Sequence, residues 1–569
     1  MVMRSRIELT GIPASRGIGL GNAYILEDNT EDVSPEKIQT NEVEGHLDRF
    51  RRSINYLREK FERLKKSESG EVAEILDAQI ETLKDPELNK SIQHKIKNEL
   101  YRSEYAIYST FNEYIHVMEN ADSEWLNDRT IDLIAIRDQL IDIVRNRRRE
   151  TEVTENSVIF ASNISPTKMI ELSRQNIAGV VMEKGGLTSH AVILSQSLDI
   201  PCVINVKWNR KKLLKGEEVF VDGDTGKVII RPDERESRYY RDRKEEQERL
   251  YQESLKIIDQ PSETRCGSPF HLQANVEFLE ELPRIEKHGA HGVGLLRTET
   301  ILFQKTGFDV EAQLKFYREV VQASGGSEVT IRLFDAGGDK LIGDSDLEAN
   351  PFLGWRGIRM LLDRQDLLDN QLEAIYRLSG EFPGQIKMLV PMISCMSELN
   401  KLKKAAENIR TKLEKGSVNI DSELPIGIMI EVPSAALLAE QFAENVDFFS
   451  IGTNDLTQYT LAVDRGNERI SDLFQPNHPA VWKLIQMTKV GADKHGVPVA
   501  VCGEMASKPK EAACLIGMGI NSLSMTTSAL PAVKAFLCDH TLDEMQLLAD
   551  SVLSANSPLE AEKLLNQFV

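Results

Sequence analysis

Cysteine is scarce in this chain of 569 residues, and the six that occur are scattered without a Cys-x-x-Cys pair. This spacing excludes a disulfide scaffold and a zinc knuckle. No apolar run approaches the roughly 18 to 20 residues that cross a bilayer, and the first ten residues lack the apolar core of a signal peptide. We therefore expect a cytoplasmic protein without a membrane-spanning segment.

Positive charge is also in short supply, because 69 lysines and arginines face 89 aspartates and glutamates. The resulting formal net charge of −20 repels phosphate backbones and favours basic partners. Nucleic acid is thus excluded as the main ligand. At roughly 100 to 200 residues per domain, the length predicts three or more packed units.

The first 232 residues combine two kinds of pattern. Helical periodicity from the Ser34-Pro35 cap to Val144 predicts an all-α subdomain over residues 30–148, which begins with a long helix over residues 34–67. Short apolar runs from residue 157, with a hairpin around residues 223–226, predict a small α/β domain. We expect this domain to comprise residues 1–29 and 149–232, and the helical subdomain to be inserted into it.

The remaining residues divide into a linker and a barrel. Residues 233–262 open with a strongly charged stretch and predict an exposed linker helix. Beyond it, eight short strand-like runs alternate with helix-length patterns, which predicts a (β/α)8 TIM barrel over residues 263–569 with an insertion that includes 336–356. The fold class is therefore multidomain α/β. The eight runs are residues 271–278, 292–299, 329–335, 386–393, 425–432, 448–455, 498–504 and 521–526.

Charged and polar residues gather at the C-terminal ends of the predicted barrel strands. These ends share one face of a barrel, where barrel enzymes keep their active sites. Carboxylates on neighbouring strands can hold a hard divalent ion, and arginines match phosphate. One such residue alone is more often part of a loop salt bridge, but the whole set indicates a site for a small, multiply charged phosphorylated acid. The set comprises Arg297, Glu299, Arg332, Asp335, Glu431, Asn454, Asp455, Cys502 and Glu504.

A second candidate is His190, in the sequence Gly-Gly-Leu-Thr-Ser-His at residues 185–190. The pattern places the histidine in the first turn of a helix, where the helix dipole favours anions and disfavours imidazole protonation. A neutral imidazole there can accept a phosphoryl group. The alternative interpretation of this sequence is a Thr-Ser helix cap with an incidental histidine. Cys502 also has an alternative interpretation, because a cysteine alone is most often a small buried apolar residue.

Several sequence blocks, in order, carry a resemblance to a known family. The chain resembles enzyme I of the phosphoenolpyruvate:sugar phosphotransferase system, the phosphoenolpyruvate-protein phosphotransferases, over nearly its whole length. The blocks are GGLTSHA around His190, GLLRTE around Arg297, IRLFDAGGDK at 331–340, NPFLGWRGIR at 350–359, IEVPSA at 430–435, SIGTNDLTQYTLAVDRGN at 450–467 and VCGEMA at 501–506.

This resemblance implies a mechanism and roles for individual residues. His190 would take the phosphoryl group of phosphoenolpyruvate and pass it to a histidine of the carrier HPr, which docks on the helical subdomain. The α/β domain would swivel between the two, and the barrel would form a homodimer. The implied roles are phosphoryl binding by Arg297 and Arg332, Mg²⁺ binding by Glu431 and Asp455, completion of the substrate clamp by Asn454 and Arg465, and proton donation to the enolate by Cys502.

The chain departs from the family pattern near His190. Met169 stands where the family usually has a threonine, and Ser195-Gln196 replace a usual Ala-Arg pair. Methionine cannot donate the hydrogen bond that threonine can, and a nearby positive charge is missing. These changes favour an unusual HPr, and they leave open a regulatory protein that binds phosphoenolpyruvate without passing a phosphoryl group onward.

Two relatives with a similar histidine domain and barrel are alternatives. Phosphoenolpyruvate synthase and pyruvate phosphate dikinase need an additional nucleotide-binding domain, and the sequence contains no ATP phosphate loop. The nitrogen-branch homologue carries an extra sensory domain, whereas the match here begins at Gly11. Both alternatives are therefore disfavoured.

Overall fold

The computed structural model describes residues 5–26, 33–65, 70–119, 124–145, 153–185, 190–210, 213–303, 309–337, 350–464, 470 and 473–568. The chain divides into two compact units, Met1–Glu248 and Arg249–Val569. Among the described residues, none of the helices is both long enough and apolar enough to traverse a bilayer.

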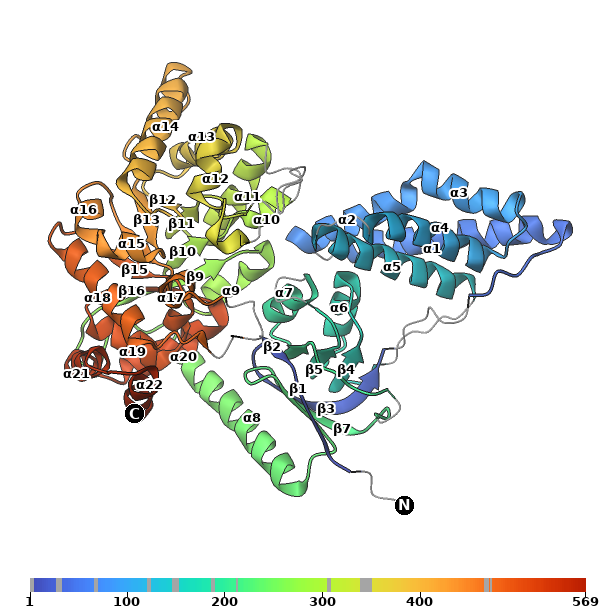
Figure 1. The fold of residues 1–569 in the computed structure, drawn as a ribbon, viewed down its shortest axis with the longest axis horizontal. Coiled ribbons are helices and arrows are strands. Elements are labelled where there is room, and N and C mark those ends of the chain that lie inside the picture. Colours follow the sequence, from blue (N-terminus) through green and yellow to red (C-terminus); the bar gives the residue numbers. More distant parts are fainter. Residues whose placement is uncertain are drawn as a thin grey trace. The chain divides into compact units, whose positions relative to one another are not determined.

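The first unit contains an eight-stranded mixed sheet in the order β1-β8-β7-β3-β4-β5-β6-β2 (Figure 1). Its parallel centre runs from β3 to β6, and antiparallel pairs extend both sides. The expected strands after residue 157 are confirmed, including the β7–β8 hairpin, whereas β1 to β3 were not predicted. The strands are β1 (Ile7–Thr10), β2 (Ile12–Ser15), β3 (Ile18–Ile25), β4 (Ser157–Ala161), β5 (Gly179–Met182), β6 (Cys202–Ile204), β7 (Glu218–Asp222) and β8 (Lys227–Ile230).

Two short helices, α6 (Pro166–Ser173) and α7 (His190–Ser197), connect the parallel strands of this sheet. Between β3 and β4 the chain forms the predicted all-α region. Contacts between α2 and α6 join that region to the α/β domain. Its helices are α1 (Val43–Lys65), α2 (Gly70–Lys84), α3 (Pro86–Lys97), α4 (Ser103–Glu119) and α5 (Glu124–Val144).

The predicted start of the first long helix at Ser34 is wrong, because α1 begins at Val43. The preceding residues form an isolated antiparallel bridge, in which Lys37 faces Tyr101 and the Ile38 amide donates to the Leu100 carbonyl at 2.7 Å. Backbone pairing with a distant segment thus replaces the local helix that the Ser-Pro cap favours.

The expectation of an exposed linker helix is only partly correct. Helix α8 (Glu234–Leu255) packs its first half on the sheet of the first unit, where Tyr240 is buried and stacks on Phe220 with ring centroids 5.2 Å apart. Ion pairs reinforce this contact: Arg243 reaches Asp222 at 2.7 Å. The boundary between the two units falls within the same helix.

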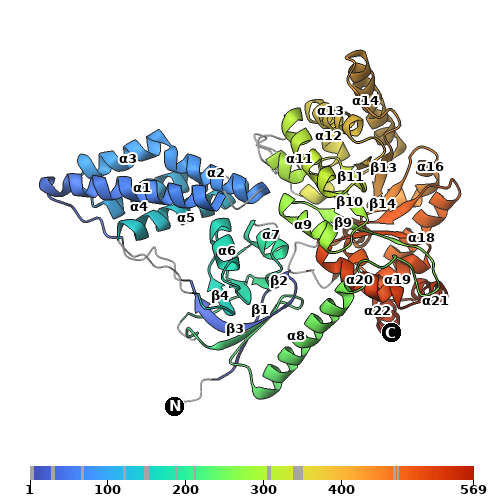
Figure 2. The same ribbon diagram turned by 180° about the vertical axis from the view of Figure 1, so that it is seen from behind.

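The second unit contains the predicted barrel, with all eight expected strands (Figures 1 and 2). Every neighbouring pair is parallel, and β16 closes the barrel on β9. The strands are shorter than predicted because their polar C-terminal residues leave the sheet to line the mouth. They are β9 (His271–Val276), β10 (Gly292–Leu296), β11 (Glu328–Arg332), β12 (Ile386–Val390), β13 (Ile426–Ile430), β14 (Phe449–Ile451), β15 (Val499–Val501) and β16 (Ser522–Met525).

Helices surround these strands and bury a continuous apolar layer against them. Part of the expected insertion, residues 338–349, lies outside the described residues, and a backbone bridge between Gly337 and Arg356 joins its two ends. The helices are α9 (Pro283–Lys287), α10 (Glu299–Phe303), α11 (Val310–Ala323), α12 (Ile358–Asp363), α13 (Gln365–Glu381), α14 (Met396–Lys415), α15 (Pro433–Leu437), α16 (Ala439–Ala443), α17 (Thr453–Leu461), α18 (Pro479–Asp493), α19 (Pro509–Gly517), α20 (Leu530–Cys538), α21 (Leu542–Leu553) and α22 (Pro558–Gln567).

The ends of β14 and β15 approach each other closely at Gly503. A Cβ atom at this position would lie 1.9 Å from Thr453 Oγ1 and 2.6 Å from the Thr453 backbone nitrogen. Only glycine fits at position 503 without moving the backbone. The close contact between Gly503 and Thr453 therefore fixes the start of α17 next to Cys502.

We predict that Gly503→Ala destabilises the protein by roughly 1 to 3 kcal/mol, because the added methyl group overlaps backbone atoms. Denaturant unfolding of the purified protein measures this change. The matched control is Gly45→Ala in α1, where a Cβ atom meets nothing within 4 Å and should stabilise the helix by up to about 1 kcal/mol. Equal stability of the two variants would contradict the close approach.

Candidate active site

The C-terminal ends of the barrel strands bring together most of the side chains that the sequence singled out. Arg332 is the last residue of β11, and Glu431 directly follows β13. Asp455 lies in the first turn of α17 after β14, and Cys502 directly follows β15. Parallel strands place these positions at one mouth of the barrel, which explains why residues far apart in sequence meet here.

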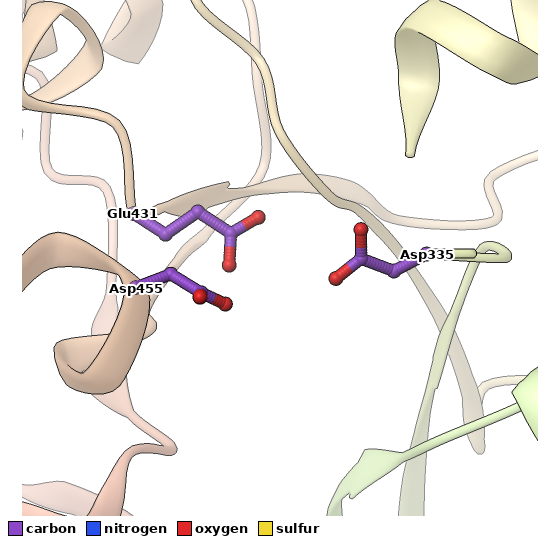
Figure 3. Close-up of side chains that lie close together, drawn as sticks. All are labelled: Asp335, Glu431 and Asp455. Carbon is purple, nitrogen blue, oxygen red and sulfur yellow. The ribbon is translucent and has the colours of Figure 1, made fainter. Parts of the chain in front are cut away.

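Three carboxylates form the centre of this mouth. Asp335, Glu431 and Asp455 each offer one oxygen, and these oxygens all lie within 4.8 Å of one another. Figure 3 shows Glu431 and Asp455 side by side, with Asp335 facing them from another part of the chain. Glu431 is 1% exposed, so this charge lies almost entirely out of water. The sequence predicted the pairing of Glu431 with Asp455, and the structure adds Asp335 as a third carboxylate.

Two arginines balance part of this negative charge. Arg356 contacts Asp335 through two hydrogen bonds, from Nε to Oδ1 at 3.1 Å and from Nη2 to Oδ2 at 2.7 Å. Arg332 lies 3.3 Å from the same Asp335 oxygen and 3.0 Å from Glu299. Burial opposes ionisation of Asp335, but the two arginines hold its pKa below the usual value.

Glu431 has the opposite titration behaviour. Burial, and then the negative charges of Asp335 and Asp455, raise the pKa of Glu431 to about 8. One of its oxygens accepts a hydrogen bond from the Met392 amide at 2.6 Å. Without a further positive charge nearby, its surroundings therefore favour the protonated carboxyl group.

Besides Arg332, two of the four predicted substrate ligands are described at the barrel mouth, and the fourth cannot be placed. Arg297 pairs with Glu277 at 2.9 Å. Asn454 donates to Glu504 Oε1 at 3.1 Å and accepts from the Glu504 amide at 3.0 Å, which fixes the orientation of its amide group. Arg465 lies outside the described residues.

The Cys502 thiol lies at the C-terminal end of β15, where it packs with Leu295, Leu389 and Met429. It is 5% exposed and donates to the Ile451 carbonyl at 3.6 Å. Burial raises the pKa of Cys502 to about 11, so the thiol keeps its proton at neutral pH.

In the first unit, His190 is the first residue of α7, as the sequence predicted, although its side chain lies outside the described part of the chain. Of the substituted positions near it, Met169 and Ser195 are buried in the domain, whereas Gln196 is exposed. Met169 is fully buried, and the Ser195 hydroxyl donates to the Ala191 carbonyl at 2.7 Å. The Gln196 amide donates to the Ala14 carbonyl at 2.7 Å. These residues therefore support α7 against its own domain.

Comparison with known proteins gives matches along the chain. Residues 251–541 match the family described as PEP-utilising enzyme, PEP-binding domain; residues 10–129 match its N-terminal domain, and residues 153–226 its mobile domain. The phosphoenolpyruvate-protein phosphotransferase of Listeria innocua is 33% identical over 99% of both chains. That of Bacillus subtilis is 32% identical over 97% of this chain and 98% of its own.

The chain belongs to the phosphoenolpyruvate-protein phosphotransferase family. It is therefore an enzyme of this class, with the multidomain α/β fold and C-terminal barrel that the sequence predicted. The match to the PEP-binding domain covers all eight barrel strands and the carboxylate cluster.

Two residues at the mouth of this phosphotransferase were missed by sequence reasoning. Arg356 lies in the block at 350–359, and Tyr459 in the block at 450–467, but neither follows a barrel strand directly. The Tyr459 hydroxyl accepts a hydrogen bond from Arg356 at 3.2 Å and donates to the Phe352 carbonyl. The quoted blocks contained the available signal, since a polar residue of α17 and the arginine at the end of the expected insertion both fall within them.

We predict that Glu431 makes the metal-free protein less stable as pH rises from about 4.5 to about 8. The folded state keeps the Glu431 proton across this window, whereas the unfolded state releases it. Thermal unfolding in a chelating buffer should show a flatter pH dependence for Glu431→Gln. The exposed control Glu423→Gln should follow the wild type, and an unchanged curve for Glu431→Gln would contradict the prediction.

Proposed function

We propose that this enzyme transfers the phosphoryl group of phosphoenolpyruvate to His190, releases pyruvate, and then phosphorylates a histidine of the carrier HPr. This is the first step of the sugar phosphotransferase system. The observation that carries the proposal is the barrel mouth, where Glu431 and Asp455 present oxygens within 4.8 Å beside arginine side chains. Family membership supports phosphoenolpyruvate as the donor.

The donor set at the mouth fits a divalent cation. Among the described residues, the buried Asp455 Oδ1 has no hydrogen-bond partner, and Glu431 has a raised pKa that a nearby cation would lower. Carboxylate oxygens are the ligands that Mg²⁺ prefers. We assign Glu431 and Asp455 as the residues that would hold Mg²⁺. When bound, the ion would neutralise charge on the transferring phosphoryl group.

The chain's own cations would orient the substrate. The Nε atoms of Arg297 and Arg332 are buried without a hydrogen-bond partner among the described residues. Guanidinium groups form bidentate hydrogen bonds with phosphate, so we assign both arginines to binding of the phosphoryl group. Asn454, with its amide fixed by Glu504, and Arg465 would complete the clamp.

Cys502 would supply the proton that turns the enolate into pyruvate. The thiol lies at the C-terminal end of β15 and stays protonated at neutral pH because of its burial. A neutral thiol that is positioned next to the enolate carbon can act as a general acid and protonate it. Loss of the proton leaves a thiolate, which Arg332 and Arg297 stabilise electrostatically.

His190 at the start of α7 would carry the phosphoryl group between the two sites. The helix N-terminus favours the neutral imidazole as acceptor and the phosphorylated form as product. The proposal requires the first unit to bring this residue to the barrel mouth and then to HPr, and the unit boundary within α8 supplies a place for that motion.

We place HPr on the helical subdomain, and a homodimer contact on the barrel, as the family resemblance implies. Four acidic residues of α2, Glu71, Glu74, Asp77 and Glu81, could attract a basic patch on HPr. However, Asp77 and Glu81 already pair with Lys65 at 2.6 Å and Lys84 at 2.8 Å. The side chains of Glu71 and Glu74 lie outside the described part of the chain. Attraction of HPr must therefore involve more than an unpaired acidic face on α2.

We predict that His190→Ala abolishes phosphoryl transfer from labelled phosphoenolpyruvate to the enzyme and to HPr but preserves binding of phosphoenolpyruvate, because the barrel holds the substrate. Radiolabelling with a purified HPr measures transfer, and calorimetry measures binding. His495→Ala, in the barrel, is the control and should label normally. Undiminished labelling of His190→Ala would show another acceptor, and binding without transfer in the wild type would support a sensor.

We predict that Cys502→Ala slows pyruvate formation by about 10²-fold or more while the protein keeps a cooperative unfolding transition, because only the proton donor is removed. A coupled lactate dehydrogenase assay measures the rate. Cys266→Ala removes an exposed thiol and should leave the rate unchanged. Normal turnover by Cys502→Ala would exclude its role as the proton donor.

A further inference from the structure

Both the backbone and the side chain of Arg356 are held in place at the barrel mouth. Its backbone pairs with Gly337, and its side chain is 9% exposed. The guanidinium group also lies over the ring of Phe352 at 5.6 Å and donates to the Tyr459 hydroxyl at 3.2 Å. Contacts from three parts of the chain thus fix this group beside the three carboxylates.

The three carboxylates differ in how their oxygens are engaged. Both oxygens of Asp335 face guanidinium groups, since Arg356 binds Oδ1 and Oδ2 and Arg332 lies 3.3 Å from Oδ2. By contrast, Asp455 Oδ1 has no hydrogen-bond partner among the described residues. Asp335 is therefore bound on both sides, whereas Asp455 still offers an oxygen to a ligand.

Asp455 is also within reach of the same arginine. Arg356 Nη2 lies 2.7 Å from Asp335 Oδ2 but 3.7 Å from Asp455 Oδ2. A guanidinium group freed from Asp335 would need to move only about 1 Å to form a normal charged hydrogen bond with Asp455. It would then compete with any cation for that carboxylate.

We propose that Asp335 is a positioning residue, not a metal ligand: it holds Arg356 and so keeps Asp455 available to the cation. This inference rests on the proposed function, in which Glu431 and Asp455 hold Mg²⁺. The geometry thus explains why three carboxylates lie together although only two of them would bind the cation. It also places Arg356, whose donors are used by Asp335 and Tyr459, outside the set of arginines that grip the substrate.

Paired variants separate a positioning role of Asp335 from a role as a metal ligand. Asp335→Asn releases Arg356 and weakens cation binding, although Asp335 does not touch the cation. Removing Arg356 as well, in Asp335→Asn with Arg356→Met, eliminates the competitor and restores binding. A true ligand at position 335 would behave differently, because deletion of Arg356 cannot replace a missing ligand oxygen.

The test measures Mn²⁺ binding to the full-length protein, without substrate, by electron paramagnetic resonance. Asp335→Asn is expected to weaken Mn²⁺ affinity by about tenfold or more, and the double variant to return to within about threefold of the wild type. The matched control places Arg356→Met on Asp455→Asn, where no recovery is expected. Thermal unfolding verifies that each variant folds, and Arg356→Gln replaces Arg356→Met if the latter does not.

The outcomes separate failure of the positioning role of Asp335 from failure of the proposed metal site. A double variant that binds as weakly as Asp335→Asn would make Asp335 a ligand and overturn the inference. Unchanged affinity in Asp335→Asn would overturn it as well, because Arg356 would then not compete. A wild type that binds no Mn²⁺ at the mouth would instead remove the metal site of the proposed function.

Discussion

The arrangement of the barrel mouth depends on the neutralisation of buried carboxylates. Asp335, Glu431 and Asp455 lie close together and largely out of water, where unpaired like charges are costly. Arg332 and Arg356 compensate Asp335, and a raised pKa favours the protonated form of Glu431. The protein thus keeps Asp335 paired with arginine, whereas one oxygen of Asp455 has no hydrogen-bond partner among the described residues.

This division suits the chemistry that we propose. Phosphoryl transfer needs positive charge around the transferring group and little covalent assistance, so a cation and fixed arginines supply most of what is required. Enolate protonation needs a group that keeps its proton at neutral pH, and burial gives Cys502 that property. His190, the acceptor that we propose, belongs to the other unit of the chain.

Much of this could be predicted from the sequence, for a physical reason. Buried parallel strands leave apolar runs of similar length, and the polar residue after each run must lie at one end of the barrel, so Glu431, Asp455 and Cys502 could be grouped without coordinates. The pairing of Asp335 with Arg356 could not, because it depends on how residues 350–356 return to the mouth. Likewise, long-range backbone pairing near Lys37, not local propensity, decides where α1 begins.

Anomalous diffraction from crystals of the full-length enzyme soaked with Mn²⁺ would show which carboxylates contact the cation. We expect one manganese peak at the barrel mouth, in contact with oxygens of Glu431 and Asp455, while Asp335 remains hydrogen-bonded to Arg356. A peak in contact with Asp335, with Arg356 displaced, would contradict the division of the three carboxylates. A map without manganese at the mouth would contradict the metal site itself.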